Sequence, residues 1–104
     1  MSLRPPAQYE SLSATQLGPN PLEDEIAAEK AAALGRSGEK VEHTLARLNS
    51  LERGTPERAE SLRQAAEAVY AYFIQRELCG FRRHEAIIRE YEIPRAVLAR
   101  LGAK

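Results

Sequence analysis

The sequence is poor in the residues that stabilise or equip many small proteins. It has one cysteine, one methionine, no tryptophan and six aromatic residues among 104. A single thiol excludes a disulfide scaffold, which needs cysteines in pairs. No apolar run approaches the roughly 18 residues of a membrane span, and no hydrophobic segment typical of a secretory signal is present. The sequence therefore predicts a cytoplasmic protein with no membrane partner.

An excess of charge of one sign is also lacking, because 15 basic residues balance 15 acidic ones. This balance argues against a protein that coats nucleic acid in bulk. Hydrophobic residues make up 43% of the chain, but 17 of them are alanines, which leaves material for a thin core only. A chain this short buries a modest share of its surface, so oligomerisation is an effective way to complete the core.

The first 19 residues differ in composition from the rest. Four of the six prolines fall within the first 21 residues, and residues 1–19 show neither helical nor alternating periodicity. We expect a flexible or extended arm there, followed by a single helical domain over residues 20–104. In an alternative arrangement, Tyr9, Leu12 and Leu17 hold parts of the arm in a groove.

Two long helices are predicted in the middle of the chain. Asn20 is a good N-cap and Pro21 suits the first helical position, so the first helix is expected over about residues 20–53. The second is expected over about residues 56–79. The short turn Gly54-Thr55-Pro56 between them predicts an antiparallel hairpin.

Two short helices are expected to cap this hairpin. Ile87, Ile88 and Tyr91 form a one-sided cluster in the first, over about residues 83–91, and Pro94 begins the second, over about residues 94–101. Valine and isoleucine total eight and never alternate with polar residues, so no strand is indicated. The predicted fold class is all-α.

The apolar stripes exceed what one hairpin can bury. In the first helix, Leu22, Ile26 and Ala33 point about a quarter-turn away from the stripe made by Leu34, Val41, Leu45 and Leu48. Either the helix bends or makes a close crossing near Gly35 and Gly38, or its halves pack on different neighbours.

The second helix also carries two stripes, about 100° apart. One comprises Leu62, Ala66, Val69 and Phe73, and the other comprises Tyr70, Ile74 and Leu78. We therefore expect a homodimer with a core resembling a four-helix bundle.

Residues suited to catalysis or metal binding are scarce. Glu39 and His43 share a helix face, but no second pair accompanies them and His84 is not in a metal motif, so no metal or cofactor is expected. Cys79 lies at a helix C-terminus, where the dipole disfavours the thiolate. A reactive thiol there, the minor alternative, would need compensation from Arg76, Arg82, Arg83 and His84. The sequence predicts a protein that is not an enzyme.

Positive charge gathers at the C-terminal end. Residues 76–104 carry seven basic and four acidic side chains, whereas residues 1–75 carry eight basic and eleven acidic ones. Such an end suits an acidic partner, or the acidic helices of the same fold or of a second copy. The candidate binding residues are Arg76, Arg82, Arg83, Arg89, Arg95 and Arg100.

The segment from 84 to 102 supports an alternative function. Its pattern of helix, turn at Glu92-Ile93-Pro94, and helix has about the lengths of a helix-turn-helix, with Arg95 and Arg100 on the second helix. Two positions depart from that motif: Glu92 stands where glycine is common, and Ile88 where a small residue is common. A small DNA-binding regulator is therefore the alternative to a protein interaction module.

Three segments carry a resemblance to a known family. The runs Gln75–Arg82 (QRELCGFR), Ile87–Pro94 (IIREYEIP) and Val97–Gly102 (VLARLG) resemble a family of short bacterial proteins with a domain of unknown function. The similarity extends to Arg4-Pro5-Pro6 and to residues 22–34. It implies a small helical cytoplasmic protein and supplies no activity or ligand. The leading prediction is a non-enzymatic protein–protein interaction module that acts as a homodimer.

Overall fold

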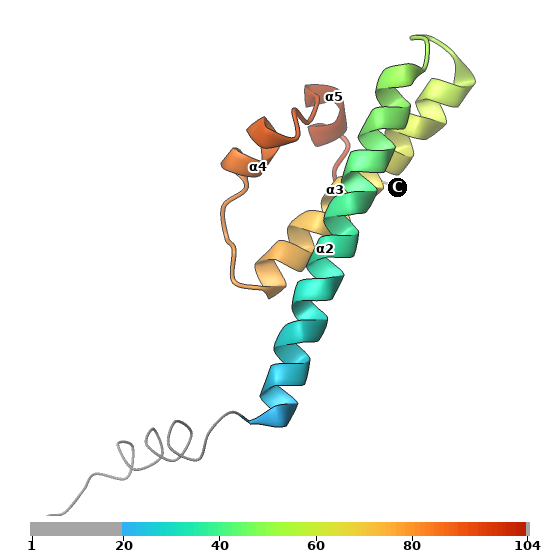
Figure 1. Cartoon of the computed structure of the whole chain (residues 1–104). Helices are drawn as coiled ribbons and strands as arrows, with labels where there is room; N and C mark the ends of the chain where they lie inside the picture. Colours follow the sequence, from blue (N-terminus) through green and yellow to red (C-terminus); the bar gives the residue numbers. More distant parts are fainter. Residues whose placement is uncertain (1–19, 104) are drawn as a thin grey trace, which may run out of the picture.

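The computed structural model describes residues 20–103, and every regular element in this range is a helix (Figure 1). The elements in chain order are α2 (Pro21–Ser50), α3 (Pro56–Leu78), α4 (Glu85–Glu90) and α5 (Arg95–Leu98). The all-α prediction is confirmed, as are the two long helices that pack against each other. The arm predicted for residues 1–19 lies outside the described range.

Helix α2 begins where its capping residues predict. The Asn20 Oδ1 atom accepts a hydrogen bond of 2.9 Å from the Leu22 amide, and Pro21 opens the first turn. The helix runs without interruption through Gly35 and ends at Ser50, earlier than the predicted boundary near residue 53. It ends there because Leu51 is extended, with φ −102° and ψ 147°.

The turn between α2 and α3 closes the predicted hairpin. Gly54 adopts a φ of 83°, which glycine reaches at little cost, and the Thr55 hydroxyl caps α3 by accepting from the Arg58 amide at 3.1 Å. The Arg58 guanidinium then donates to the carbonyl oxygens of Leu48 and Leu51 at 2.8 and 3.1 Å. It thereby satisfies acceptors that the end of α2 leaves free.

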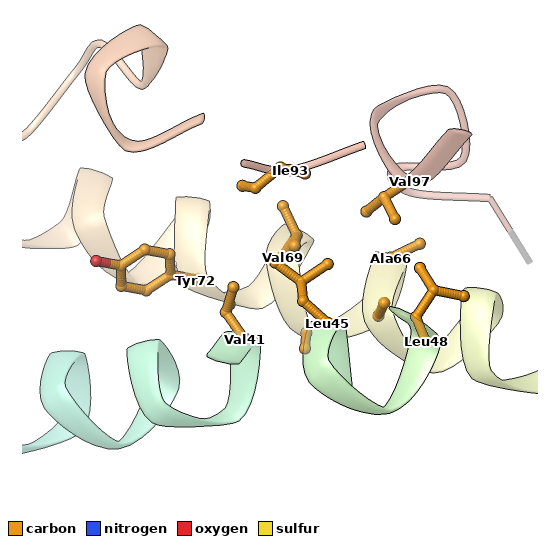
Figure 2. Close-up of a cluster of buried hydrophobic side chains, with 10 residues drawn as sticks. Val41, Leu45, Leu48, Ala66, Val69, Tyr72, Ile93 and Val97 are labelled. Carbon is orange, nitrogen blue, oxygen red and sulfur yellow. The ribbon is translucent and has the colours of Figure 1, made fainter. Parts of the chain in front are cut away.

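The core lies between α2, α3 and the C-terminal segment (Figure 2). Helix α2 contributes the predicted stripe of Val41, Leu45 and Leu48, all buried. Opposite them, α3 presents small side chains and one large ring; its buried apolar residues are Ala65, Ala66, Ala68, Val69 and Tyr72. Small residues on α3 allow the two helix axes to approach closely.

Gly38 lies on α2 beneath the side chains of Tyr72 and Tyr91. A Cβ atom there would lie 3.4 Å from a Tyr72 ring carbon and 3.4 Å from the Tyr91 hydroxyl, whereas Gly35 has nothing within 4 Å. Of the two local explanations for the glycine pair, a close crossing therefore applies at Gly38.

The C-terminal segment covers one side of the hairpin. Ile93 and Val97 are buried in the core, and the Tyr91 ring meets the Tyr72 ring edge-on at a centroid distance of 5.9 Å. Helices α4 and α5 are both shorter than predicted. Glu92 joins them with a φ of 52°, a left-handed conformation that is costly for a residue with a Cβ atom. None of the four helices in residues 20–103 is long and apolar enough to cross a membrane.

Candidate interaction surface

The loop between α3 and α4 is held in place by Arg76. Its Nε atom donates to His84 Nδ1 at 3.1 Å, and its Nη2 atom donates to the Arg83 carbonyl oxygen at 2.9 Å. The guanidinium lies 4.9 Å from the centre of the Phe81 ring, within the range of a cation–π interaction. Arg76 thus joins the last turns of α3 to three residues of the following loop.

His84 completes this arrangement from the other side. Its ring stacks on Phe73 at a centroid distance of 4.1 Å and an angle of 4°, and its Nε2 atom lies 3.0 Å from Glu77 Oε2. Because Nδ1 accepts from Arg76, the proton of the neutral ring is on Nε2 and is donated to Glu77. We call Phe73, Arg76, Glu77 and His84 the loop clamp.

The six arginines singled out in the sequence do not share one environment. Arg76 is half-buried and bonded within the chain, whereas the other five are exposed. Arg82 and Arg83 are neighbours in the clamped loop, Arg89 lies on α4 and Arg95 opens α5. Arg100 follows α5 and lines a pocket against α3. The fold therefore presents Arg82 and Arg83 together and distributes the remaining three over separate elements.

The charges around Arg83 are only weakly paired. Arg83 lies 3.4 Å from Glu85, but both side chains are largely exposed, at 86% and 63%. A backbone hydrogen bond in the first turn of α4, with Arg83 nearby, lowers the pKa of the Glu85 carboxyl. Within residues 20–103, Arg82 is in no ion pair. Exposed pairs contribute little energy, so both guanidinium groups are available to an acidic partner.

An apolar stripe runs along the surface of α3 that the hairpin leaves uncovered. Tyr70, Ile74 and Leu78 follow one another at four-residue intervals and are 46%, 42% and 62% exposed. They form the second stripe expected from the sequence, and we call them the outer stripe. Phe81, in the adjoining loop, is 48% exposed. The outer stripe and Phe81 thus place apolar surface directly beside Arg82.

The beginning of α2 extends beyond the end of α3. The Cys79 Sγ atom lies 3.8 Å from the Lys30 carbonyl oxygen, which places the end of α3 beside that residue. From there α2 continues alone toward its N-terminus (Figure 1). We call residues 21–29 the projecting segment; all of them are exposed, including Leu22 at 62% and Ile26 at 48%.

A shallow pocket adjoins the other end of the outer stripe. Its volume is about 440 Å³, and its lining includes Arg63, Tyr70, Arg100 and Gly102. Arg63 is already paired with Glu60 at 2.6 Å, and this hydrogen bond lowers the pKa of the Glu60 carboxyl. The pocket is open and its exposed lining is mostly apolar, so it extends the exposed apolar surface.

The remaining candidate groups are dispersed. Cys79 is half-buried at the end of α3, with its sulfur near the Lys30 carbonyl oxygen. His43 is exposed on α2, and within residues 20–103 no three metal-binding side chains come together. The features concentrated in one place are apolar surface and arginine.

Sequence reasoning missed two residues that position this surface. Arg58 was not distinguished from other helix-surface arginines, although it joins both helices of the hairpin. His84 was considered only for catalysis and metal binding, whereas it supports the loop clamp. For His84 a local signal exists, because the i, i+8 spacing from Arg76 spans a helix end and a glycine. For Arg58 the acceptors belong to the preceding helix, so no local pattern reveals them.

Comparison with known proteins gives a family and no activity. No curated protein and no solved structure matches the chain. One family does match, and it covers residues 1–104. This agrees with the resemblance carried by the segments around Cys79, Tyr91 and Leu98. The chain belongs to the family of unknown function DUF6665.

Proposed function

We propose that this chain is a cytoplasmic, non-enzymatic protein–protein interaction module that acts as a homodimer. The observation that carries the proposal is the apolar surface left uncovered on two long helices. Six large apolar side chains are between 42% and 62% exposed: Leu22, Ile26, Tyr70, Ile74, Leu78 and Phe81. Exposed apolar groups of this size, when contiguous and rimmed by charge, mark interaction sites.

The area is sufficient for a specific interface. Each of these half-exposed side chains presents roughly 100 Å² of apolar surface, so one copy offers roughly 600 Å². A symmetric pair would bury roughly twice that area, which is at the lower end of stable protein–protein interfaces. The monomer core supports the same conclusion, because the largest fully buried side chains are only Leu48, Val41, Val69, Val97 and Ser61.

The arginines define the polar side of the proposed surface. Arg82 and Arg83 adjoin Phe81 at the end of the outer stripe, and their charges lack strong partners within the described chain. They suit an acidic partner that also contacts the apolar groups. Charge reversal of both residues should weaken binding to that partner. Unchanged affinity would assign binding to the outer stripe alone.

Sedimentation equilibrium of the full chain at micromolar concentration tests the homodimer. We expect twice the chain mass for the wild type and one chain mass for Ile74→Glu/Leu78→Glu, which places two charges on the outer stripe. The matched control is Ala46→Glu/Ala59→Glu, which adds the same charge at exposed positions near the α2–α3 turn and should remain dimeric. A monomeric wild type would contradict the proposal.

One observation favours the DNA-binding alternative. Glu92 adopts the left-handed conformation that the turn of a helix-turn-helix requires, despite having a side chain. Helix α5 has only four residues, however, which is short for a helix that must read base edges in the major groove. Fluorescence anisotropy with mixed-sequence duplex DNA separates the functions. Binding that weakens steeply with salt would support a DNA-binding regulator, and absence of binding at low salt would exclude it.

A further inference from the structure

The projecting segment is a helix without a tertiary neighbour in the described chain. Every residue from 20 to 32 is exposed, and beyond Lys30 nothing in residues 20–103 lies alongside α2 (Figure 1). Helices in proteins derive most of their stability from packing of an apolar face. Leu22 and Ile26 provide such a face, at i and i+4, and it is unoccupied within the described chain.

The same segment carries a concentrated negative charge. Glu23, Asp24, Glu25 and Glu29 lie within its nine residues, and no base is present before Lys30. None of these four acids is in an ion pair within residues 20–103. The projecting segment therefore combines two exposed apolar side chains with a dense set of carboxylates that have no ion-pair partner in the described chain.

The end of α3 is its chemical complement. Leu78 and Phe81 are exposed apolar groups, and Arg82 and Arg83 are exposed bases beside them. Within one copy the two surfaces cannot meet, because the loop after α3 turns back toward α4 while the projecting segment runs the other way (Figure 1). Both surfaces nevertheless lie away from the α2–α3 turn, because α3 stops beside Lys30 and the projecting segment continues from there to the end of the described chain (Figure 1).

We propose that in the homodimer the projecting segment of each copy lies against the end of α3 and the Arg82-Arg83 loop of the other. This inference rests on the proposed function and identifies the acidic partner of the arginines as a second copy of the chain. A twofold axis at this end of the molecule brings each projecting segment to the other copy's α3, so both contacts form at once. Leu22 and Ile26 would then cover Leu78 and Phe81, with carboxylates facing guanidinium groups at the rim.

A charge exchange between two full-length variants tests this arrangement. The first variant, Glu23→Lys/Asp24→Lys/Glu25→Lys, makes the projecting segment basic. The second, Arg82→Glu/Arg83→Glu, makes the α3–α4 loop acidic. Each variant alone places like charges at both contacts, and we expect its dimer dissociation constant to rise about tenfold or more. In an equimolar mixture the opposite charges meet at both contacts, so the heterodimer should form about as tightly as the wild type.

The control exchanges charge at the opposite end of the hairpin. Arg47→Glu/Arg53→Glu changes the net charge by the same amount as the loop variant, but its positions lie near the α2–α3 turn. We expect it to dimerise like the wild type. Far-UV circular dichroism of every variant shows that the helices are retained.

The outcomes separate this inference from the proposed function. A wild-type dimer whose affinity is unaffected by either charge variant, or a mixture without rescue, would overturn the reciprocal contact while leaving the homodimer intact. A monomeric wild type would overturn both. Hydrogen exchange would then identify what covers the two surfaces in that monomer. If the Ile26 and Leu78 amides exchanged more slowly than helix formation alone explains, residues 1–19 of the same chain would cover them.

Discussion

Replacing Arg76 by alanine should destabilise the protein through the loop clamp. The substitution removes two hydrogen bonds from a charged donor, at 3.1 and 2.9 Å, and a cation–π contact with Phe81 at 4.9 Å. Hydrogen bonds from charged groups contribute about 1.5–3 kcal/mol each when buried, and water replaces part of this at a half-buried site. We therefore expect a loss of about 2 kcal/mol in the free energy of unfolding, or about 10 °C in Tm.

The assay is urea and thermal unfolding followed by circular dichroism at one fixed protein concentration, since association with a second copy would itself change the apparent stability. The control is Arg47→Ala on α2, outside the proposed dimer contact, whose guanidinium is exposed and in no ion pair within the described chain. Its effect should remain within about 0.5 kcal/mol. If Arg76→Ala were no more destabilising than Arg47→Ala, the reasoning would be refuted.

A double-mutant cycle identifies the partner of Arg76. His84→Phe keeps an aromatic ring on Phe73 but removes both ring nitrogens, including the acceptor of the Arg76 bond. Combined with Arg76→Ala, it should cost about 1 kcal/mol less than the sum of the single effects, because both remove the same hydrogen bond. Additive effects would show that the two side chains act independently.

Three further predictions concern stability. Ser61 is only 2% exposed, and its hydroxyl has no hydrogen-bond partner within the described chain. Ser61→Ala should therefore stabilise the fold by about 1 kcal/mol, measured as a higher urea midpoint. A lower midpoint would show that the hydroxyl has a partner. Arg58→Ala should lower the free energy of unfolding by about 1–2 kcal/mol, because two carbonyl groups at the end of α2 lose their hydrogen-bond donor. The control Arg63→Ala, on the exposed face of the same helix, should lower it by less than about 0.5 kcal/mol. Burial, with the Tyr72 hydroxyl beside it, raises the pKa of Tyr91 to about 12. The raised pKa means that the folded state favours the neutral phenol of Tyr91. The stability that the neutral phenol contributes is therefore complete below pH 10 and is lost as the pH rises from 10 to 12. Because Tyr91 is partly exposed, this stability is about 1 kcal/mol. Tyr91→Phe should therefore lose about 1 kcal/mol less stability than the wild type between pH 10 and 12. Identical stability profiles against pH would contradict the raised pKa of Tyr91.

Local chemistry accounts for the parts of the fold that were predicted from the sequence. Asn20 and Thr55 cap their helices with side-chain oxygens, and Gly54 and Gly80 adopt positive φ values of 83° and 100° at the helix ends. Each of these preferences is determined within about four residues of chain. They suffice to define the two long helices and the antiparallel hairpin.

The shorter helices show where such local reasoning loses accuracy. Helix α5 was expected over about residues 94–101 but contains only Arg95–Leu98, because the chain after it turns and approaches α3 through Gly102. A Cβ atom at Gly102 would lie 3.5 Å from the Tyr70 ring. Glu92 adopts a left-handed φ that its side chain disfavours, so packing of Tyr91 and Ile93 on the hairpin must outweigh that local cost.

The sequence predicted which residues belong to the candidate surface, but only part of how they are arranged in space. Spacing at four-residue intervals was enough to group Tyr70, Ile74 and Leu78 on one side of α3, and the structure leaves that side exposed. Counting charges placed all six arginines in one set of candidate binding residues. It could not show that the Arg76 guanidinium is bonded to His84 and Arg83 within the chain.

By itself, the sequence determined the helical class, the hairpin and the stripes, because capping, turn residues and apolar periodicity act over a few residues. Only the tertiary structure decided that Tyr72 is buried against Gly38 and that Arg58 joins both helices. It also decided that α2 extends past Cys79 at the end of α3. These relations join residues that are distant in the chain or lie on different elements, and they depend on how closely two helices pack and where one ends beside the other. For the same reason, it took the structure to place an acidic helix segment and a basic loop, neither strongly paired within residues 20–103, on the side of the molecule away from the α2–α3 turn.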